Sequence, residues 1–299
     1  MSQSPERAQA ALALRREGEG LAQALPALLV AAEHLAATVQ MGGHGRRRPG
    51  MGEEFWQYRP SHSGDSPRMI DWRRSARSDL EYVRDREWQA AQSVHLWVDD
   101  SASMRYTGAD TRPEKGSRAR VLALALSVLM IRAGERVGLA GPSAPPRPGR
   151  AQLMNLAARL SEVPAEVPDY GAPEVTHLAA QSRAVFLSDF LGDPAPLEAA
   201  LGALADRGVT GVLMQVLDPM EEDFPFDGRT IFESMGGGLA YETRKAGGLR
   251  ARYRERLAER RDRLGHLARQ AGWQFMTHHT GETAQAALLW LYAGLERAR

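Results

Sequence analysis

One stretch of the chain decides the fold: Val94-His95-Leu96-Trp97-Val98-Asp99-Asp100-Ser101-Ala102-Ser103. Its first five residues are largely apolar and predict a strand, and the aspartates and serines that follow mark where the strand ends. Ser117–Arg132 is apolar enough for a buried helix. This part of the chain therefore predicts a strand, a loop and a helix in succession, which is the repeating unit of parallel α/β sheets.

The same alternation continues to the end of the chain. The predicted strands cover residues 94–98, 136–140, 184–187, 209–217 and 273–276, with a short one over 230–232. The predicted helices cover residues 117–132, 152–160, 197–206, 249–270 and 282–295. Strands that alternate with helices predict a three-layer α/β fold with a doubly wound, mainly parallel sheet.

Two different segments precede this sheet. Residues 4–40 have apolar side chains at helical spacing, with a kink or boundary expected at Pro26. Residues 42–50 combine glycines, a proline and three arginines, so we expect an exposed basic loop there and no regular element. We predict a helical segment over 1–40, an Arg-rich subdomain over 41–92 that packs on the sheet, and an α/β domain over 93–299.

Length and composition exclude several classes of protein. The 299 residues are 43% hydrophobic, which is enough for a sizeable core, and the formal net charge of +1 argues against a dedicated nucleic-acid coat. The absence of cysteine excludes a disulfide scaffold, a thiolate zinc site and a Cys nucleophile. We find no apolar run of about 20 residues and no signal-peptide pattern, so we expect a cytoplasmic protein without membrane insertion.

The residues after the first predicted strand have the chemistry of a metal site. Asp99, Ser101 and Ser103 are spaced so that three oxygens can point to one place at the carboxyl end of the sheet. Asp189 ends another predicted strand and could supply a second carboxylate. Carboxylates and hydroxyls are ligands suited to Mg²⁺. The sequence therefore makes Mg²⁺ a candidate cofactor.

This arrangement resembles the metal-ion-dependent adhesion site of the von Willebrand factor A fold, whose first motif is Asp-x-Ser-x-Ser. Asp99, Ser101 and Ser103 match that motif, and Asp189 matches the family's later Asp. The family also uses a Thr from an intermediate loop, and Thr176 is the only candidate in the corresponding region. The resemblance implies a Rossmann-like domain that presents Mg²⁺ to a carboxylate of a protein partner, through a site that is degenerate at the Thr position.

A second resemblance covers residues of about 40 to 220. The run Gly64-Asp65-Ser66-Pro67-Arg68-Met69-Ile70-Asp71-Trp72-Arg73-Arg74-Ser75-Ala76-Arg77 is similar to the signature of the bacterial domain-of-unknown-function family fifty-eight. This resemblance implies an adaptor or co-chaperone role, with a MoxR-type AAA+ ATPase or its client protein as the partner. It implies no particular reaction.

The signature also has a physical interpretation as an internal clamp. Its carboxylates and guanidinium groups could form bidentate ion pairs that hold the subdomain, and its tryptophan could supply buried area. The residues concerned are Asp65, Arg68, Asp71, Trp72, Arg73 and Arg77. Arg46, Arg47 and Arg48 are flanked by glycines and could instead contact an acidic partner or belong to a solvated loop.

The remaining charged motifs favour no catalytic machinery. The Arg-rich predicted helix over 249–270 is expected to be a surface helix, with Leu257, Leu264 and Leu267 facing the sheet. His278 and His279 are expected in a loop. No sequence motif identifies a nucleophile and its base. We therefore predict a non-catalytic, protein-binding adaptor; the alternatives are a metal-dependent hydrolase, a nucleic-acid-binding protein and a structural scaffold with a vestigial site.

Overall fold

The computed structural model describes residues 28–39, 46–50, 54–62, 70–77, 80–141, 145–162, 166–238 and 240–297. The chain divides into two compact units. Residues 43–92 form one, and Met1–Gly42 together with Ser93–Arg299 form the other. None of the helices in the described ranges is long and apolar enough to cross a membrane.

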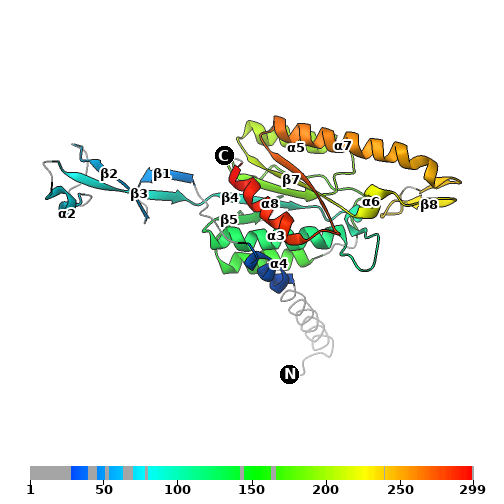
Figure 1. The fold of residues 1–299 in the computed structure, drawn as a ribbon, viewed down its shortest axis with the longest axis horizontal. Coiled ribbons are helices and arrows are strands. Elements are labelled where there is room, and N and C mark those ends of the chain that lie inside the picture. The colour runs from blue at the N-terminus through cyan, green and yellow to red at the C-terminus, as the bar shows by residue number, and fades with distance from the viewer. Residues whose placement is uncertain are drawn as a thin grey trace, which may run out of the picture. The chain divides into compact units, whose positions relative to one another are not determined.

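The larger unit is a three-layer α/β structure, which confirms the predicted fold class (Figure 1). Its sheet contains β4 (Ser93–Val98), β5 (Arg136–Leu139), β6 (Arg183–Ser188), β7 (Thr210–Leu217) and β10 (Gln274–His279). Its main helices are α3 (Lys115–Arg132), α4 (Arg150–Ser161), α5 (Ala195–Asp206), α7 (Arg250–Gln270) and α8 (Ala284–Arg297). Shorter elements are η2 (Ala102–Arg105), α6 (Pro219–Asp223), η3 (Ala246–Leu249) and a hairpin of β8 (Thr230–Glu233) and β9 (Ala240–Thr243).

The order of the strands creates a switch point in the middle of the sheet. The order is β10-β7-β6-β4-β5, and every pairing is parallel. The chain passes from β4 to β5 on one side and then crosses to β6 on the other side of β4. The carboxyl ends of β4 and β6 therefore flank the crevice where open α/β sheets bind ligands.

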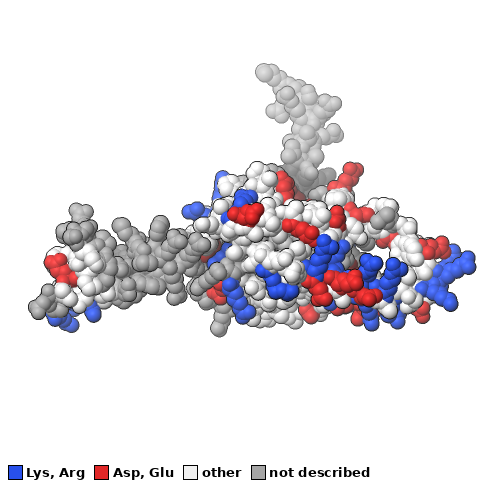
Figure 2. Space-filling view, turned by 90° about the horizontal axis from the view of Figure 1, so that it is seen from above, with Lys and Arg blue, Asp and Glu red and all other residues white. Residues whose placement is uncertain are grey.

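Charged side chains of both signs are interspersed on the surface of this unit. Figure 2 looks onto the side covered by α5 and α7, where Arg and Lys side chains gather with Asp and Glu among them. Such a surface agrees with the formal net charge of +1 for the whole chain.

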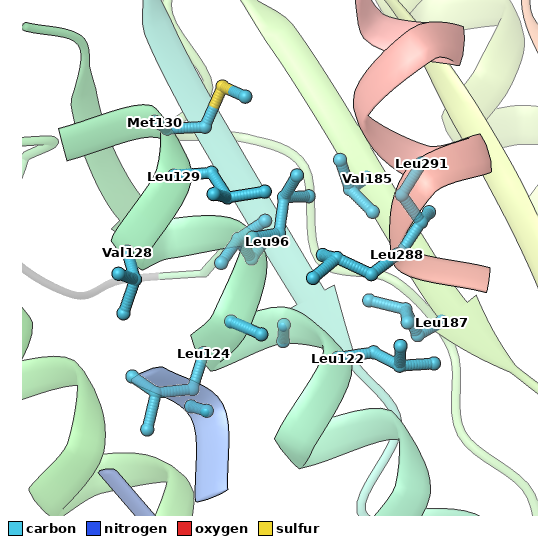
Figure 3. Packing of buried hydrophobic residues seen from close by; sticks show 14 of the residues in the cluster. Leu96, Leu122, Leu124, Val128, Leu129, Met130, Val185, Leu187, Leu288 and Leu291 are labelled. Carbon is cyan, nitrogen blue, oxygen red and sulfur yellow. The ribbon is translucent and has the colours of Figure 1, made fainter. Parts of the chain in front are cut away.

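The sheet is buried on both faces. On one face, α3, α4, α8 and the helix over residues 28–37 form the larger core cluster. Figure 3 shows Leu122 of α3 and Leu288 of α8 packing with Leu96 of β4. Helix α3 lies between the sheet and its neighbouring helices, which explains why its sequence is apolar on almost every side.

The other face of the sheet is covered by α5 and α7. Leu257 and Leu264 of α7 are buried, and Leu267 packs against the same core cluster, as predicted for this helix. The rings of Phe186 and Trp273 meet edge to face at 5.0 Å within it. The Arg-rich helix is therefore held by its leucines and presents most of its arginines to solvent.

The smaller unit overturns one prediction. It contains β1 (Arg46–Gly50), β2 (Glu54–Pro60), α2 (Trp72–Ser75) and β3 (Tyr82–Ala90), with the antiparallel order β1-β3-β2. The expectation of an irregular loop over 42–50 is therefore wrong for Arg46–Gly50. Strand β1 pairs with the side of β3 that β2 leaves open, and as an edge strand of this sheet it tolerates Pro49.

Three further predictions are modified. The helix expected over 4–40 is present over residues 28–37, and residues 4–27 lie outside the described ranges. Residues 218–227, where the sequence predicts neither a strand nor a helix, contain α6, which begins with a capping box. His278 and His279 end β10 and do not lie in a loop, because the pairing of β10 with β7 continues to its last residue.

Candidate functional site

Polar side chains end two neighbouring strands at the switch point. Strand β4 is followed directly by Asp99, and β6 ends with Ser188 and is followed by Asp189. The backbone N–H of Asp99 donates to the carbonyl of Leu187 at 2.9 Å, so strand pairing continues to this point. We call the residues from Asp99 to Ser103, together with Ser188 and Asp189, the rim. It lies where the topology places a binding site.

The Asp-x-Ser-x-Ser motif forms one buried cluster. Asp99 is only 2% exposed, and its carboxylate accepts hydrogen bonds from the backbone N–H of Ser101 at 2.9 Å and the hydroxyl of Ser188 at 2.6 Å. The hydroxyl oxygens of Ser101 and Ser103 lie 3.3 Å apart. Burial raises the pKa of Asp99, while the hydrogen bonds from Ser188 and Ser101 act in the opposite direction. Both carboxylate oxygens of Asp99 thus already have donors within the chain.

Asp189 is paired with a buried lysine. The ammonium of Lys115, at the start of α3, lies 2.9 Å from Asp189 Oδ2 and 2.6 Å from Glu221 Oε1 of α6. The other oxygen of Asp189 accepts from the backbone N–H of Leu191 at 3.0 Å. Burial pulls the pKa of Lys115 down, but the two carboxylates outweigh it and the pKa is raised. Lys115 is therefore an ammonium at neutral pH and supplies the positive charge of the rim.

A second ion pair fixes the segment that carries Glu221. Arg112 donates from Nε and Nη2 to the two carboxylate oxygens of Asp218, both at 2.9 Å. Asp218 caps α6 and also accepts from the Thr280 hydroxyl at 3.0 Å. Burial raises the pKa of Asp218, but the hydrogen bond from Arg112 and those of the cap lower it to about 2. Asp218 is thus a charged anchor that positions Glu221 beside Lys115.

The chain's own backbone covers the Asp99 cluster. The backbone N–H groups of Ala102 and Ser103 donate to the carbonyls of residues 168 and 169, each at 2.9 Å. A Cβ at Gly171 would lie 2.2 Å from Asp99 Oδ1, and a Cβ at Gly236 would lie 1.8 Å from a carboxylate oxygen of Asp169. Glycine at these positions lets residues 168–171 lie on the rim and the β8–β9 loop lie on residues 168–171.

These donors do not fit a divalent cation in this arrangement. Mg²⁺ needs oxygens that are free to face it in near-octahedral geometry. Asp189 is neutralised by the Lys115 ammonium, and the oxygens of Asp99 accept hydrogen bonds beneath the backbone of Gly171. Within the described ranges, no group of three or more His, Asp or Glu side chains could hold a metal ion.

Thr176 does not complete such a site either. It is exposed, and its carbonyl accepts from the guanidinium of Arg207 at 3.4 Å. Arg207 follows the last residue of α5, close to where β7 begins, and this is the opposite end of the strands from the rim. The intermediate Thr implied by the resemblance therefore has no counterpart in Thr176.

The family signature folds as a capped turn. Asp71 caps α2 by accepting from the backbone N–H of Arg74 at 3.1 Å, and it accepts from the Tyr58 hydroxyl at 3.3 Å. Trp72 is 58% exposed, so the expectation that it is buried is wrong: it begins a four-residue helix that buries none of its residues. The remaining signature residues are Arg73 and Arg77, which are exposed, and Asp65 and Arg68, which lie outside the described ranges. The side chains of Arg46, Arg47 and Arg48 also lie outside the description.

The two adjacent histidines contact different partners. Nε2 of His278 lies 3.1 Å from the guanidinium of Arg118, and Nε2 of His279 contacts Glu222. Both rings also approach Glu282, at 3.3 and 3.6 Å. Burial and the charge of Arg118 lower the pKa of His278 to about 4, so it is neutral at pH 7.

Sequence reasoning missed the residues that neutralise the rim. Asp189 pairs with Lys115, which also pairs with Glu221, and Asp99 accepts a hydrogen bond from Ser188. Lys115, Glu221 and Ser188 lie outside the predicted motif. One signal was available: Lys115 is one of only two lysines in a chain with 38 basic residues. Arginine is the usual partner in a buried ion pair, so a rare lysine in an arginine-rich chain marks a position with a special requirement.

Comparisons with known proteins agree on one family. A family model described as protein of unknown function DUF58 matches residues 57–263. Uncharacterised proteins of Mycobacterium tuberculosis and Mycobacterium bovis are each 30% identical over 237 residues, which cover 74% of this chain and 73% of theirs.

Two solved structures from Bacteroides are also similar. An aerotolerance-related membrane protein from Bacteroides fragilis matches 69% of this chain and 100% of its own, with 15% identity and a TM-score of 0.42. BatB from Bacteroides thetaiotaomicron, a conserved hypothetical protein, matches 69% of this chain and 97% of its own, with 16% identity and a TM-score of 0.40.

Proposed function

The chain belongs to the DUF58 family, and from that premise we propose that it is a non-catalytic adaptor that docks a protein partner beside the rim. The observation that carries this proposal is the β8–β9 hairpin. It exposes three large apolar side chains: Ile231 is 58% exposed, Met235 50% and Tyr241 58%. The register pairs Tyr241 with Phe232 and Ile231 with Glu242, so Ile231 and Tyr241 project from opposite faces of the hairpin, and a partner that covers both would clasp it from two sides.

The hairpin is held at the rim. The contact between Gly236 and Asp169 brings its loop to residues 168–171, which cover Asp99. Its base is anchored by an aromatic cluster, in which Phe224 stacks on Phe232 at 5.5 Å and on Tyr253 of α7 at 4.8 Å. A hairpin fixed at both ends can present apolar side chains with little loss of conformational entropy on binding.

The chemistry of the rim favours binding over catalysis. The hydrogen-bond partners of Asp99 are Ser101 and Ser188, and Asp189 pairs with Lys115. A hydrolase would need a base within reach of a nucleophile, and an open position for substrate. The rim's acidic groups are instead used for internal bonds, so the metal-dependent hydrolase is the weaker alternative.

The resemblance in the signature supplies the partner. On this proposal the chain acts in the cytoplasm, and it binds a MoxR-type AAA+ ATPase or the client protein that the ATPase remodels. Because Lys115 neutralises Asp189, we propose that docking needs no Mg²⁺, in contrast to the adhesion-site mechanism implied by the Asp-x-Ser-x-Ser motif.

The test is a binding measurement between the purified chain and a purified MoxR-type ATPase of the same organism, by biolayer interferometry in nucleotide-free buffer. The double variant Ile231→Asp, Tyr241→Asp should weaken binding at least about tenfold, because it places charges in an apolar interface. The matched control is Leu289→Asp on α8, where the side chain is also exposed, at 53%; it should bind like the wild type.

Two results would contradict the proposal. The first is an ATPase that does not bind the wild-type chain, and the second is binding that the hairpin variant leaves unchanged. Binding that is lost in EDTA would retain the adaptor and overturn its independence of metal.

A further inference from the structure

A groove runs beside α7 and is distinct from the buried Asp99 cluster. It has a volume of about 710 Å³ and lies between α7 and the loop that connects β6 to α5. Leu191, Pro194 and Leu257 give it apolar walls, and Tyr170 and Tyr253 line it as well. It is therefore a surface with both apolar area and room for a ligand.

The charge of the groove is strongly positive. Four arginines line it, against the single carboxylate of Glu259; they are Arg252, Arg256, Arg260 and Arg263. The side chain of Arg256 is 71% exposed, and its Nε lies 4.0 Å from Glu259 Oε2. An ion pair that is so exposed and so long is weak. Figure 2 looks onto the side covered by α5 and α7, where Arg and Lys side chains gather with Asp and Glu among them.

Two of the four arginines are already engaged. Arg260 donates to the carbonyl of Leu191 at 3.2 Å, and Arg263 pairs with Glu198 at 2.5 Å. These contacts fix one end of the row against the loop and α5. Arg256 and Arg252 lie about one and two turns before Arg260 in α7, and both are exposed.

The spacing of the row matches an extended peptide. Arg252, Arg256 and Arg260 follow one another at four-residue steps, which places them on one face of the helix about 6 Å apart. In an extended chain, alternate side chains lie on one side about 6.6 Å apart. Acidic residues at alternate positions of a bound strand would therefore meet successive guanidinium groups, which bind carboxylates well.

From this match in charge and spacing we infer that the α7 groove binds an extended acidic segment of a partner protein. The inference rests on the proposed adaptor function and names the chemistry of what the adaptor recognises. A nucleic acid is the poorer occupant. Leu191, Pro194 and Leu257 favour a ligand with apolar side chains, which a phosphate backbone does not offer.

The test uses fluorescence polarisation with a labelled peptide of about a dozen residues in which Glu alternates with Ala. The double variant Arg252→Glu, Arg256→Glu should weaken binding at least about tenfold. The control is Arg136→Glu, Arg150→Glu, which changes the net charge equally at two exposed arginines outside the groove. It should lower affinity far less.

Several outcomes would overturn the inference: no peptide binding, equal losses in the groove and control variants, or tighter binding of an oligothymidylate of similar length with loss in the groove variant. The ATPase experiment separates this result from the proposed function. If the ATPase binds through the hairpin and the peptide does not bind, the adaptor stands and the groove proposal is wrong. If the peptide binds in the groove and the ATPase does not bind, the groove stands and the ATPase partner is wrong.

Discussion

Lys115 carries a positive charge into a fully buried position, where Asp189 and Glu221 are its partners. Replacing it by Met would leave two carboxylates buried without a counter-charge. We expect Lys115→Met to lower the free energy of unfolding by about 3–5 kcal/mol, measured by urea denaturation at pH 7. Lys245→Met is the matched control, because this second lysine is exposed and should change stability by less than about 0.5 kcal/mol. Equal stability of the two variants would contradict the role given to the buried ammonium.

The Arg112–Asp218 pair predicts a dependence on pH. The pKa of Asp218 is about 2 in the folded chain, below its ordinary value of 3.8. Its contribution to stability is therefore fully present above pH 3.8 and is lost as the pH falls from 3.8 towards 2. Arg112→Met removes the main hydrogen-bonding partner, so this variant should be less stable than the wild type at pH 6, and the difference should shrink across that acidic window. Unfolding curves at several pH values check this, and a difference that grows on acidification would be the wrong sign.

A substitution of Gly171 by alanine should change stability through a steric clash alone, because it changes no charge. Its missing Cβ would lie 2.2 Å from Asp99 Oδ1, so Gly171→Ala must displace either residues 168–171 or the buried carboxylate. We expect a loss of about 1–3 kcal/mol in the free energy of unfolding. Gly202→Ala in α5 meets nothing within 4 Å and should gain about 0.5–1 kcal/mol, because alanine favours a helix. A Gly171→Ala variant at least as stable as the wild type would show that the close approach to Asp99 is not tight.

At the scale of elements, α2 depends on its cap. This helix has four residues and buries none of them, so the hydrogen bond from the Arg74 N–H to Asp71 is a large part of what fixes it. Asp71→Ala should lower its stability by about 1 kcal/mol, and Asp71→Asn, which is also a good cap, should cost a few tenths at most. Hydrogen exchange of the backbone amides in α2 measures this locally. Equal protection in the two variants would assign the turn's stability to other contacts.

The elements also show where local pattern is sufficient. Strand β4 and helix α3 were predictable, because each carries its own apolar run. Strand β1 was not, since Arg46–Gly50 pairs with β3 some forty residues later and shows no strand signal of its own. The same holds for Trp72, whose exposure depends on what the fold places around it.

At the scale of the whole molecule, the ion pair between Lys115 and Asp189 predicts that removing divalent cations does not change the stability of the protein. An ion that binds only the folded state stabilises it by RT ln(1 + c/Kd), where c is its free concentration, so its removal lowers the melting temperature. We expect the same melting temperature in Mg²⁺, in Mn²⁺ and in EDTA, measured by differential scanning fluorimetry. A clear loss in EDTA that Mg²⁺ reverses would show that the rim does hold a metal ion, and the same scan of Asp99→Ala would then locate it.

The residues of the site also divide into those whose contacts are local in sequence, which could be predicted, and those whose partners are distant, which could not. Asp99, Ser101 and Ser103 could be placed together, because one loop carries them at the end of one strand. The pairing of Asp189 could not be predicted, because its partner lies on a helix 74 residues earlier. Contacts of such separation leave no local pattern in the sequence, and they decide whether a carboxylate faces a metal or an ammonium.

The ion pairs of Lys115 with Asp189 and Glu221 also set an order of events during synthesis of the chain. Its two carboxylates lie 74 and 106 residues after the lysine. While the ribosome is still making the middle of the protein, the ammonium has no partner and must remain in water. Lys115 can therefore acquire both of its partners only after α6 has emerged. A chain that ends before Glu221 would lack this ion-pair cluster, so a partner that recognises the finished rim would distinguish such fragments from longer chains.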